Sequence, residues 1–347
     1  MKAWYKKYIL DFKRPSGTSR GILTKKETWF IFIEDKGKTG IGECGLLKGL
    51  SMDDVAGYEQ KLSWACNNIN DGLNSLYSRL YDFPSIQFGL EIAFRSLESD
   101  SPFNLFPSDF TRGKMPIPIN GLIWMGSREF MAMQIKEKIE AGFDCIKMKI
   151  GAIDFDTEYQ LLKSLRQDFS AEMIEIRVDA NGAFSVNEAL EKLKRLSELE
   201  LHSIEQPIRQ NQIEAMASLC EESPLPIALD EELIGISHIK DKDKLLQTIK
   251  PDYIILKPSL IGGFRSTLEW ISTAENQGVG WWITSALESN VGLNAISQWT
   301  FLRDSNMHQG LGTGGLFTNN FESPLVVKNG TLRYQPKIEW EFNLHYT

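Results

Sequence analysis

The chain has 347 residues, of which 42% are hydrophobic and 24% charged, and its formal net charge is −8. This length and composition provide one large hydrophobic core and a smaller second domain. The acidic balance gives no general attraction to nucleic acid. No apolar run approaches the roughly 18 residues of a membrane span, so we expect neither a nucleic-acid nor a membrane partner.

Cysteine and histidine usage narrows the possible metal sites. The basic N-terminal segment has an apolar stretch too short for a secretory signal. The cysteines at 44, 66, 145 and 220 have no CxxC spacing and the four histidines form no HxxxH pair, so the sequence suggests neither a zinc site nor a disulfide framework. We therefore expect a reducing, cytoplasmic location. A metal would have to bind carboxylates, which favours Mg²⁺ or Mn²⁺.

The N-terminal third predicts an α+β segment. Apolar and β-branched runs predict antiparallel strands over residues 2–12, 28–33 and 39–43, and periodic apolar residues predict helices over 53–76 and 85–97. Residues 13–23, rich in Gly, Pro and Ser, predict a loop, either a plain connector or a lid. Residues 45–52 predict a second loop.

From residue 116 the pattern alternates between short apolar strands and helices. Strands are expected at 116–120, 280–285 and, weakly, 309–311, and before Lys149, Asp179, Glu205, Asp230 and Lys257. Helices are expected at 127–141, 154–167, 185–199, 213–222, between 230 and about 249, at 266–277 and at 290–302. The tail from 324 has strand-like pieces that we expect to return to the N-terminal segment.

Five charged residues each end one of these apolar runs. The intervals from Lys149 through Asp179, Glu205 and Asp230 to Lys257 are 30, 26, 25 and 27 residues. A strand, a helix and two loops need about this many residues, because an eight-fold barrel takes roughly 250. Buried parallel strands read as such apolar runs. The spacing therefore predicts that all five charges point into one mouth of a barrel, the end at which such barrels carry out chemistry.

The lysines suit proton transfer. Strand alternation places Lys147 on the same face as Lys149, and two close ammonium groups lower each other's pKa, which makes a lysine a usable base. Arg177 and Asp179 repeat this spacing. A lone Lys-x-Lys also occurs on solvated edge strands, but the neighbouring strand ends favour the first interpretation.

The carboxylates suit a hard cation. Asp179, Glu205 and Asp230 would repel one another in one mouth unless a cation joined them, and three carboxylates leave Mg²⁺ sites for substrate oxygens and water. Asp230 as a helix cap or Asp179 in an Asx turn is the alternative for each residue alone. With Lys257 opposite Lys149, a metal between two lysines suits removal of a proton next to a carboxylate.

The runs KMK, VDANGAF, IEQP, LDEE, LKPSLIGG and TSALESNVGL resemble the muconate-lactonizing subgroup of the enolase superfamily. Arg177, SALESNVGL and LGTGGLF look most like the o-succinylbenzoate synthase family, and GTGG lacks the acidic DxD usual in dipeptide epimerases. The resemblance implies an α/β fold, a modified TIM barrel (β/α)7β over residues 116–317. It also implies an α+β capping domain built from residues 1–115 and the tail, 318–347.

The resemblance also implies a mechanism. A metal-dependent hydro-lyase would remove water from a small carboxylate substrate through an enediolate, for menaquinone synthesis, with Lys149 as base and Lys257 stabilising charge. Asp179, Glu205 and Asp230 would hold Mg²⁺, for which Mn²⁺ can substitute. Lys147, Arg177 and Ser285, with the loops near 20 and 50, would contact substrate. The glycine-rich run at 312–315 is either an anion cradle or a plain turn.

Three other interpretations remain open. In an N-acylamino acid racemase of the same subgroup, Lys149 and Lys257 would act as acid and base on opposite faces of the substrate. A muconate cycloisomerase has the same motifs. A non-catalytic barrel with a structural metal belongs to a different class, but it would not need a lysine pair.

Overall fold

The computed structural model describes residues 1–18 and 21–344. Its N-terminal part is a three-stranded antiparallel sheet of β1 (Lys2–Thr18), β2 (Gly21–Asp35) and β3 (Lys38–Cys44) in the order β1-β2-β3. The loop predicted over residues 13–23 is wrong in its described part, because β1 continues to Thr18 and β2 starts at Gly21; residues 19–20 lie outside the described residues. Pro15 fits because β1 is an edge strand whose register shifts between Asp11 and Ser16.

Helices cover one face of this sheet. They are α1 (Tyr58–Asn67), α2 (Leu73–Ser78) and α3 (Pro84–Glu98), with a 3-10 turn, η1 (Ile69–Asp71), between the first two. The single helix predicted over 53–76 is thus broken, at Asn68 and at Gly72, whose φ is 80°. The close packing of α3 on β3 requires glycine, since a Cβ at Gly42 would lie 2.0 Å from the carbonyl oxygen of Gly89.

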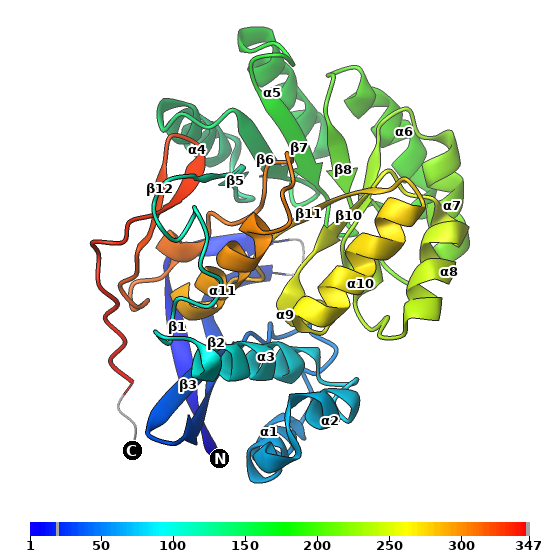
Figure 1. The fold of residues 1–347 in the computed structure, drawn as a ribbon. Coiled ribbons are helices and arrows are strands. Elements are labelled where there is room, and N and C mark those ends of the chain that lie inside the picture. The colour runs from blue at the N-terminus through cyan, green and yellow to red at the C-terminus, as the bar shows by residue number, and fades with distance from the viewer. Residues whose placement is uncertain (19–20, 345–347) are drawn as a thin grey trace.

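A curled, seven-stranded parallel sheet forms the larger part (Figure 1). Its order is β5-β6-β7-β8-β9-β10-β11, the order of the chain. The strands are β5 (Gly121–Ile123), β6 (Cys145–Lys149), β7 (Glu175–Asp179), β8 (Ser203–Glu205), β9 (Ile227–Leu229), β10 (Tyr253–Leu256) and β11 (Gly280–Ile283). Parallel bridges join Ile119 to Gln309 and Thr284 to Gly310, where the weak last strand was predicted.

Helices follow the strands on the outer face of this sheet. They are α4 (Arg128–Glu140), α5 (Phe155–Asp168), α6 (Val186–Ser197), α7 (Ile213–Glu222), α8 (Ile239–Ile249), α9 (Pro258–Ile261), α10 (Gly263–Asn276) and α11 (Asn290–Phe301), with 3-10 turns η2 (Glu231–Leu233) and η3 (Gly314–Leu316). Ser127 caps α4 as predicted, accepting from the backbone N–H of Phe130. The capping box predicted at α6 lacks the bond from a backbone N–H to the Ser185 hydroxyl. The Ser185 hydroxyl donates instead to the Glu188 side chain.

The first barrel strand lies later than predicted. Residues 116–120 contain β4 (Ile117–Pro118), which belongs to a separate small sheet. It pairs with β13 (Thr331–Tyr334), and β13 pairs with β12 (Leu325–Lys328). The parallel sheet begins with β5 instead. The chain then runs back to the N-terminal sheet. There the rings of Phe103 and Trp340 stack at 4.2 Å between centroids, and those of Phe30 and Phe342 lie 5.6 Å apart.

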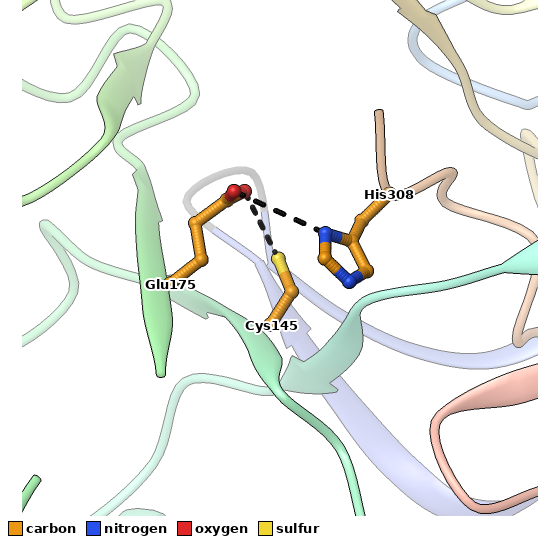
Figure 2. Close-up of side chains that lie close together, drawn as sticks. All are labelled: Cys145, Glu175 and His308. Atoms are coloured by element: carbon orange, nitrogen blue, oxygen red, sulfur yellow. Dashed lines mark hydrogen bonds and ion pairs between the residues drawn. The ribbon is translucent and has the colours of Figure 1, made fainter. Parts of the chain in front are cut away.

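Inside the curled sheet, an apolar group of side chains lies between polar residues at the two ends of the strands. Ala228, Ile255 and Trp282 pack together inside it. At the end where the strands begin, Cys145, Glu175 and His308 lie close together (Figure 2). At the opposite end lie the charged residues described below. None of the helices in the described part of the chain has both the length and the apolar composition needed to cross a bilayer.

Candidate active site

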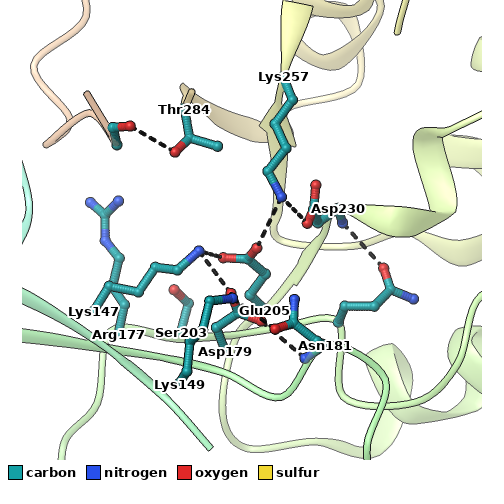
Figure 3. Close-up of polar contacts among 12 residues, drawn as sticks. Lys147, Lys149, Arg177, Asp179, Asn181, Ser203, Glu205, Asp230, Lys257 and Thr284 are labelled. Atoms are coloured by element: carbon teal, nitrogen blue, oxygen red, sulfur yellow. Dashed lines mark hydrogen bonds and ion pairs between the residues drawn. The ribbon is translucent and has the colours of Figure 1, made fainter. Parts of the chain in front are cut away.

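The five charges predicted from spacing converge at the carboxyl ends of the strands (Figure 3). The register of the sheet aligns Lys149 with Asp179 and Asp179 with Glu205 on three successive strands. Asp230 directly follows β9 and Lys257 directly follows β10. The period of two along each strand turns these side chains to the inner face together.

Ion pairs join the lysines to the carboxylates. Lys149 Nζ lies 2.7 Å from Asp179 Oδ2, and Lys147 Nζ lies 2.9 Å from the same oxygen and also donates to Glu205. From the other side, Lys257 Nζ pairs with Asp230 and lies 3.8 Å from Glu205 Oε1. The acidic group is therefore flanked by lysines from β6 and from the end of β10.

Burial makes these charges interdependent. Desolvation, with the nearby charges of Asp179 and Asp230, raises the pKa of Glu205 to about 8. Burial also disfavours the charge on Asp179, but Lys147 and Lys149 outweigh it and hold the pKa of Asp179 well below its usual value. The three carboxylates thus carry more negative charge than this buried space holds without nearby cations.

The predicted lowering of the Lys147 pKa is wrong. Desolvation lowers the pKa of Lys147, but the carboxylates of Asp179 and Glu205 more than offset it and raise the pKa above its ordinary value. The sequence argument counted the neighbouring lysine and left out the closer carboxylates. In this arrangement Lys147 is a stable cation, which suits charge compensation rather than proton removal.

The carboxylate set fits a divalent cation. Asp179, Glu205 and Asp230 are each at most 2% exposed, and hard oxygen ligands are what Mg²⁺ and Mn²⁺ prefer. Among the described residues, Glu205 Oε1 has no hydrogen-bond donor although it is buried. Such an atom normally has a partner, and a cation between the carboxylates would supply one.

A cavity of about 930 Å³ opens above these groups. Lys147, Lys149 and Lys257 line its floor, together with Asn181 and Ser285. Residues 13–16, 21–23 and 47–50, from the β1–β2 hairpin and the loop after β3, line it from the N-terminal part of the chain. The hairpin therefore lies over the mouth as a lid would, although it is a strand pair rather than a loop.

Comparison with known proteins identifies the family. Residues 131–337 match the family "Enolase C-terminal domain-like". The chain is 48% identical to the o-succinylbenzoate synthase of Desulfotalea psychrophila over 366 residues, covering 96% of this chain and 98% of that protein. The crystal structure of MenC from the same organism superposes with a TM-score of 0.85 at 45% identity, covering 96% and 99% of the two chains. The chain belongs to the o-succinylbenzoate synthase family of the enolase superfamily.

Membership in this family makes the chain an enzyme of the hydro-lyase class, and enzymes of the superfamily work with a divalent metal. A more distant relative has a different activity. The N-succinylamino acid racemase of Thermus thermophilus is 33% identical over 158 residues, which cover 46% of this chain and 40% of that protein. The same scaffold thus supports more than one activity among the relatives.

Ser285 and Arg177, both predicted from the family resemblance to contact substrate, lie in different places. Ser285 lines the cavity, where its Oγ donates to Glu288 Oε2 at 2.6 Å and accepts from Thr313 Oγ1 at 2.9 Å. Arg177 points instead into the interior below the site. Its guanidinium is bonded to Glu175 at 2.6 Å and stacks over the Trp282 ring at 4.2 Å. Arg177 is buried and is not among the residues that line the cavity, so its contact with substrate stays a prediction.

The structure adds two positioning residues of this synthase-family site that the sequence interpretation missed. Asn181 Oδ1 accepts from Lys149 Nζ at 2.7 Å. Gln206 Oε1 accepts from the backbone N–H groups of Asp230 and Glu232. Asn181 and Gln206 have positive φ angles of 44° and 40°, which are uncommon outside glycine. The dipeptide Asn181-Gly182 was the only local signal, and it reads equally as a turn.

Proposed function

We propose that the protein converts 2-succinyl-6-hydroxy-2,4-cyclohexadiene-1-carboxylate to 2-succinylbenzoate and water, as an o-succinylbenzoate synthase of menaquinone biosynthesis. The observation that carries the proposal is the pair Lys149 and Lys257, which flank three buried carboxylates on the floor of one cavity. The near-full-length identity to a curated synthase supports the choice of substrate.

Asp179, Glu205 and Asp230 would hold Mg²⁺, for which Mn²⁺ can substitute. The bound ion supplies positive charge where negative charge develops on the substrate carboxylate. Lys147 contributes a second, fixed positive charge at the same place. Its raised pKa keeps it protonated, so it binds the substrate carboxylate as an ion pair.

Lys149 is the general base in this proposal. Its Nζ takes the proton from the ring carbon next to the carboxylate and returns a proton to the departing hydroxyl on the same face. One C–H and one C–O bond break, a ring double bond forms, and water leaves. Asp179 Oδ2 and Asn181 Oδ1, each 2.7 Å from Nζ, hold the amine in position.

Lys257 approaches from the opposite side and remains protonated. Burial lowers its pKa, but the carboxylates of Asp230 and Glu205 more than offset this and raise it. A permanently charged ammonium group stabilises developing negative charge and does not remove a proton. This division of labour, with one base and one fixed cation, suits a dehydration on one face of the ring.

The cavity suits a small dianion. Its volume of about 930 Å³ lies in the range typical of small-molecule sites, roughly 300–1,000 Å³. Besides the floor lysines, five cationic residues line the walls: Lys13, Arg14, Lys48, Lys138 and Arg209. We assign the succinyl chain to the side of Ser285 and the loops near 20 and 50, where these cations can attract its carboxylate.

The same family assignment guides the interpretation of how the sheet closes and how the domains divide. We infer that the bridges of Gln309 and Gly310 close the parallel sheet into a (β/α)7β barrel over residues 116–317. Residues 1–115 and the tail, 318–347, then form the capping domain, which the aromatic packing of the tail on the N-terminal sheet supports.

Racemisation of N-succinylamino acids is the second candidate, favoured by the identity to the Thermus thermophilus racemase. The deciding experiment measures both reactions with saturating Mg²⁺. We expect rapid formation of 2-succinylbenzoate, with slower or undetectable exchange of solvent deuterium into the α-carbon of N-succinylamino acids. Faster racemisation than dehydration would make the second candidate the function, and inactivity on both would refute the proposal.

A further inference from the structure

A second group of ligand-type side chains lies at the other end of the parallel sheet (Figure 2). Cys145 and Glu175 are the first residues of β6 and β7 and are paired in register. His308 immediately precedes Gln309, which bridges to Ile119. We call these three residues the basal cluster. Lys149 lies four residue steps beyond Cys145, about 13 Å along a strand, so the cluster is separate from the active-site floor.

The ligand atoms of the basal cluster face one another. Cys145 Sγ lies 3.3 Å from Glu175 Oε1, and His308 Nδ1 lies 3.9 Å from Glu175 Oε2. One ligand atom from each of the three residues falls within 4.8 Å of the other two. In tetrahedral zinc sites with bonds of about 2.0–2.3 Å, ligand atoms stand roughly 3.3–3.7 Å apart. Small side-chain movements would therefore complete three corners of such a site.

The imidazole of His308 is held in the orientation that ligation needs. Asp144 Oδ1 lies 2.9 Å from His308 Nε2. An ionised carboxylate only accepts hydrogen bonds, so it fixes the proton on Nε2 and leaves the Nδ1 lone pair facing Cys145 and Glu175. A carboxylate on the second nitrogen is the usual support of a metal-bound histidine.

The charges around the cluster balance a divalent cation. Arg177 holds Glu175 Oε1 at 2.6 Å and leaves Oε2 for another partner. Burial opposes ionisation of Glu175, but Arg177 outweighs it and lowers the Glu175 pKa. Burial raises the pKa of the Cys145 thiol well above its usual value, so the thiolate forms only when a cation displaces its proton. In that state the negative groups Cys145, Glu175 and Asp144 sum to −3, and Arg177 brings this to −2. Nearby His202 is kept neutral because burial lowers its pKa.

We propose that the basal cluster binds a second divalent cation of the zinc class, with Cys145 Sγ, Glu175 Oε2 and His308 Nδ1 as protein ligands and water as the fourth. Mg²⁺ would not compete, because it avoids thiolate and imidazole. Binding replaces the proton on the Cys145 thiol, which is released to solvent. Glu175 and His308 are only partly buried, which leaves room for the water ligand.

Such an ion would tie the first residues of β6 and β7 to the segment that bridges β11 and Ile119. Because that segment is joined to its neighbours through the single bridges at Gln309 and Gly310, the added bonds would stabilise the fold there. The expected role is structural, since the ion lies far from the substrate cavity.

The test uses Co²⁺ as a spectroscopic substitute for zinc, added to the full-length protein with Mg²⁺ saturating. A sulfur-to-cobalt charge-transfer band reports thiolate ligation and is silent for the carboxylate site in the mouth. We expect one equivalent of Co²⁺ to produce the band in wild type and in Cys220→Ser, the matched control on α7. Cys145→Ser should lose it, and Asp144→Asn should bind Co²⁺ about 10–100-fold more weakly.

Thermal unfolding gives an independent readout. Zn²⁺ should raise the melting temperature of wild type and Cys220→Ser but leave that of Cys145→Ser unchanged. Should Cys145→Ser fail to fold, His308→Gln keeps every thiol and should weaken Co²⁺ binding at least tenfold. The proposal is overturned if wild type gives no charge-transfer band at millimolar Co²⁺, or if the band is unchanged in Cys145→Ser or in His308→Gln.

Discussion

Replacing Lys257 separates the proposed dehydration from a racemisation. The Lys257 side chain is 13% exposed and its ammonium lies 3.8 Å from Glu205 Oε1, beside the carboxylates. A unit positive charge about 4 Å from the negative charge that develops on the substrate stabilises it by roughly 4 kcal/mol at an effective dielectric constant near 20. This corresponds to about 10³-fold in rate. Lys257→Ala should therefore lose about three orders of magnitude in kcat for dehydration. Lys257→Arg keeps the charge and should remain at least about tenfold faster than Lys257→Ala.

Racemisation responds differently, because Lys257 must then exchange a proton with one enantiomer. Arginine cannot be deprotonated in proteins, so Lys257→Arg should abolish any racemisation of N-succinylamino acids that wild type shows. The assay follows 2-succinylbenzoate formation and deuterium exchange for wild type and both variants, with metal saturating. Because Lys257→Ala leaves Asp230 without its ion-pair partner, circular dichroism must confirm folding. Equal loss of dehydration in the folded Arg and Ala variants would refute the electrostatic role.

Three further predictions concern the base, the metal and the pH dependence of stability. Lys149→Ala should abolish turnover while retaining metal binding, with a loss at or beyond the upper end of the roughly 10²–10⁴-fold range for a missing base; a rate within tenfold of wild type would contradict its role. Exhaustive chelation should remove activity and Mg²⁺ should restore it, and Asp179→Asn should lose metal affinity, measured by calorimetry, while keeping the fold. Burial raises the pKa of Glu91 on α3 from 4.5 to about 7. The folded protein therefore favours the protonated side chain. The free energy of unfolding is highest below about pH 4.5 and falls by at most about 3 kcal/mol as the pH rises through about 7. Glu91→Gln should therefore be more stable relative to wild type at pH 8 than at pH 5 in urea unfolding.

The sequence predicted the five strands β6 to β10 because each is marked twice. An apolar run ends in a charge, and a helix follows at a regular interval, so an error in one signal is corrected by the other. The N-terminal hairpin has no such redundancy. Residues 13–18 look like a loop because of Pro15 and the small residues, and only pairing with β2 along an irregular edge makes them a strand.

The same contrast applies to the active site. Lys149, Asp179 and Glu205 could be brought together from sequence because parallel strands in register place equivalent ends side by side. Asn181 could not, since its contact with Lys149 depends on a backbone with positive φ. Arg177 was assigned to substrate from the family resemblance, and its position two residues before Asp179 does not specify the depth of its side chain, which reaches Glu175 and Trp282.

Depth along a strand decides which chemistry an inward-facing residue can take part in. On β6 the inward positions are Cys145, Lys147 and Lys149, and on β7 they are Glu175, Arg177 and Asp179. The period of two that puts Lys149 and Asp179 at the mouth necessarily puts Cys145 and Glu175 at the base. Arg177 lies between the two ends and bonds Glu175 at the base rather than a group at the mouth. A hard, carboxylate site and a thiol-containing site can thus share two strands without competing for the same ion.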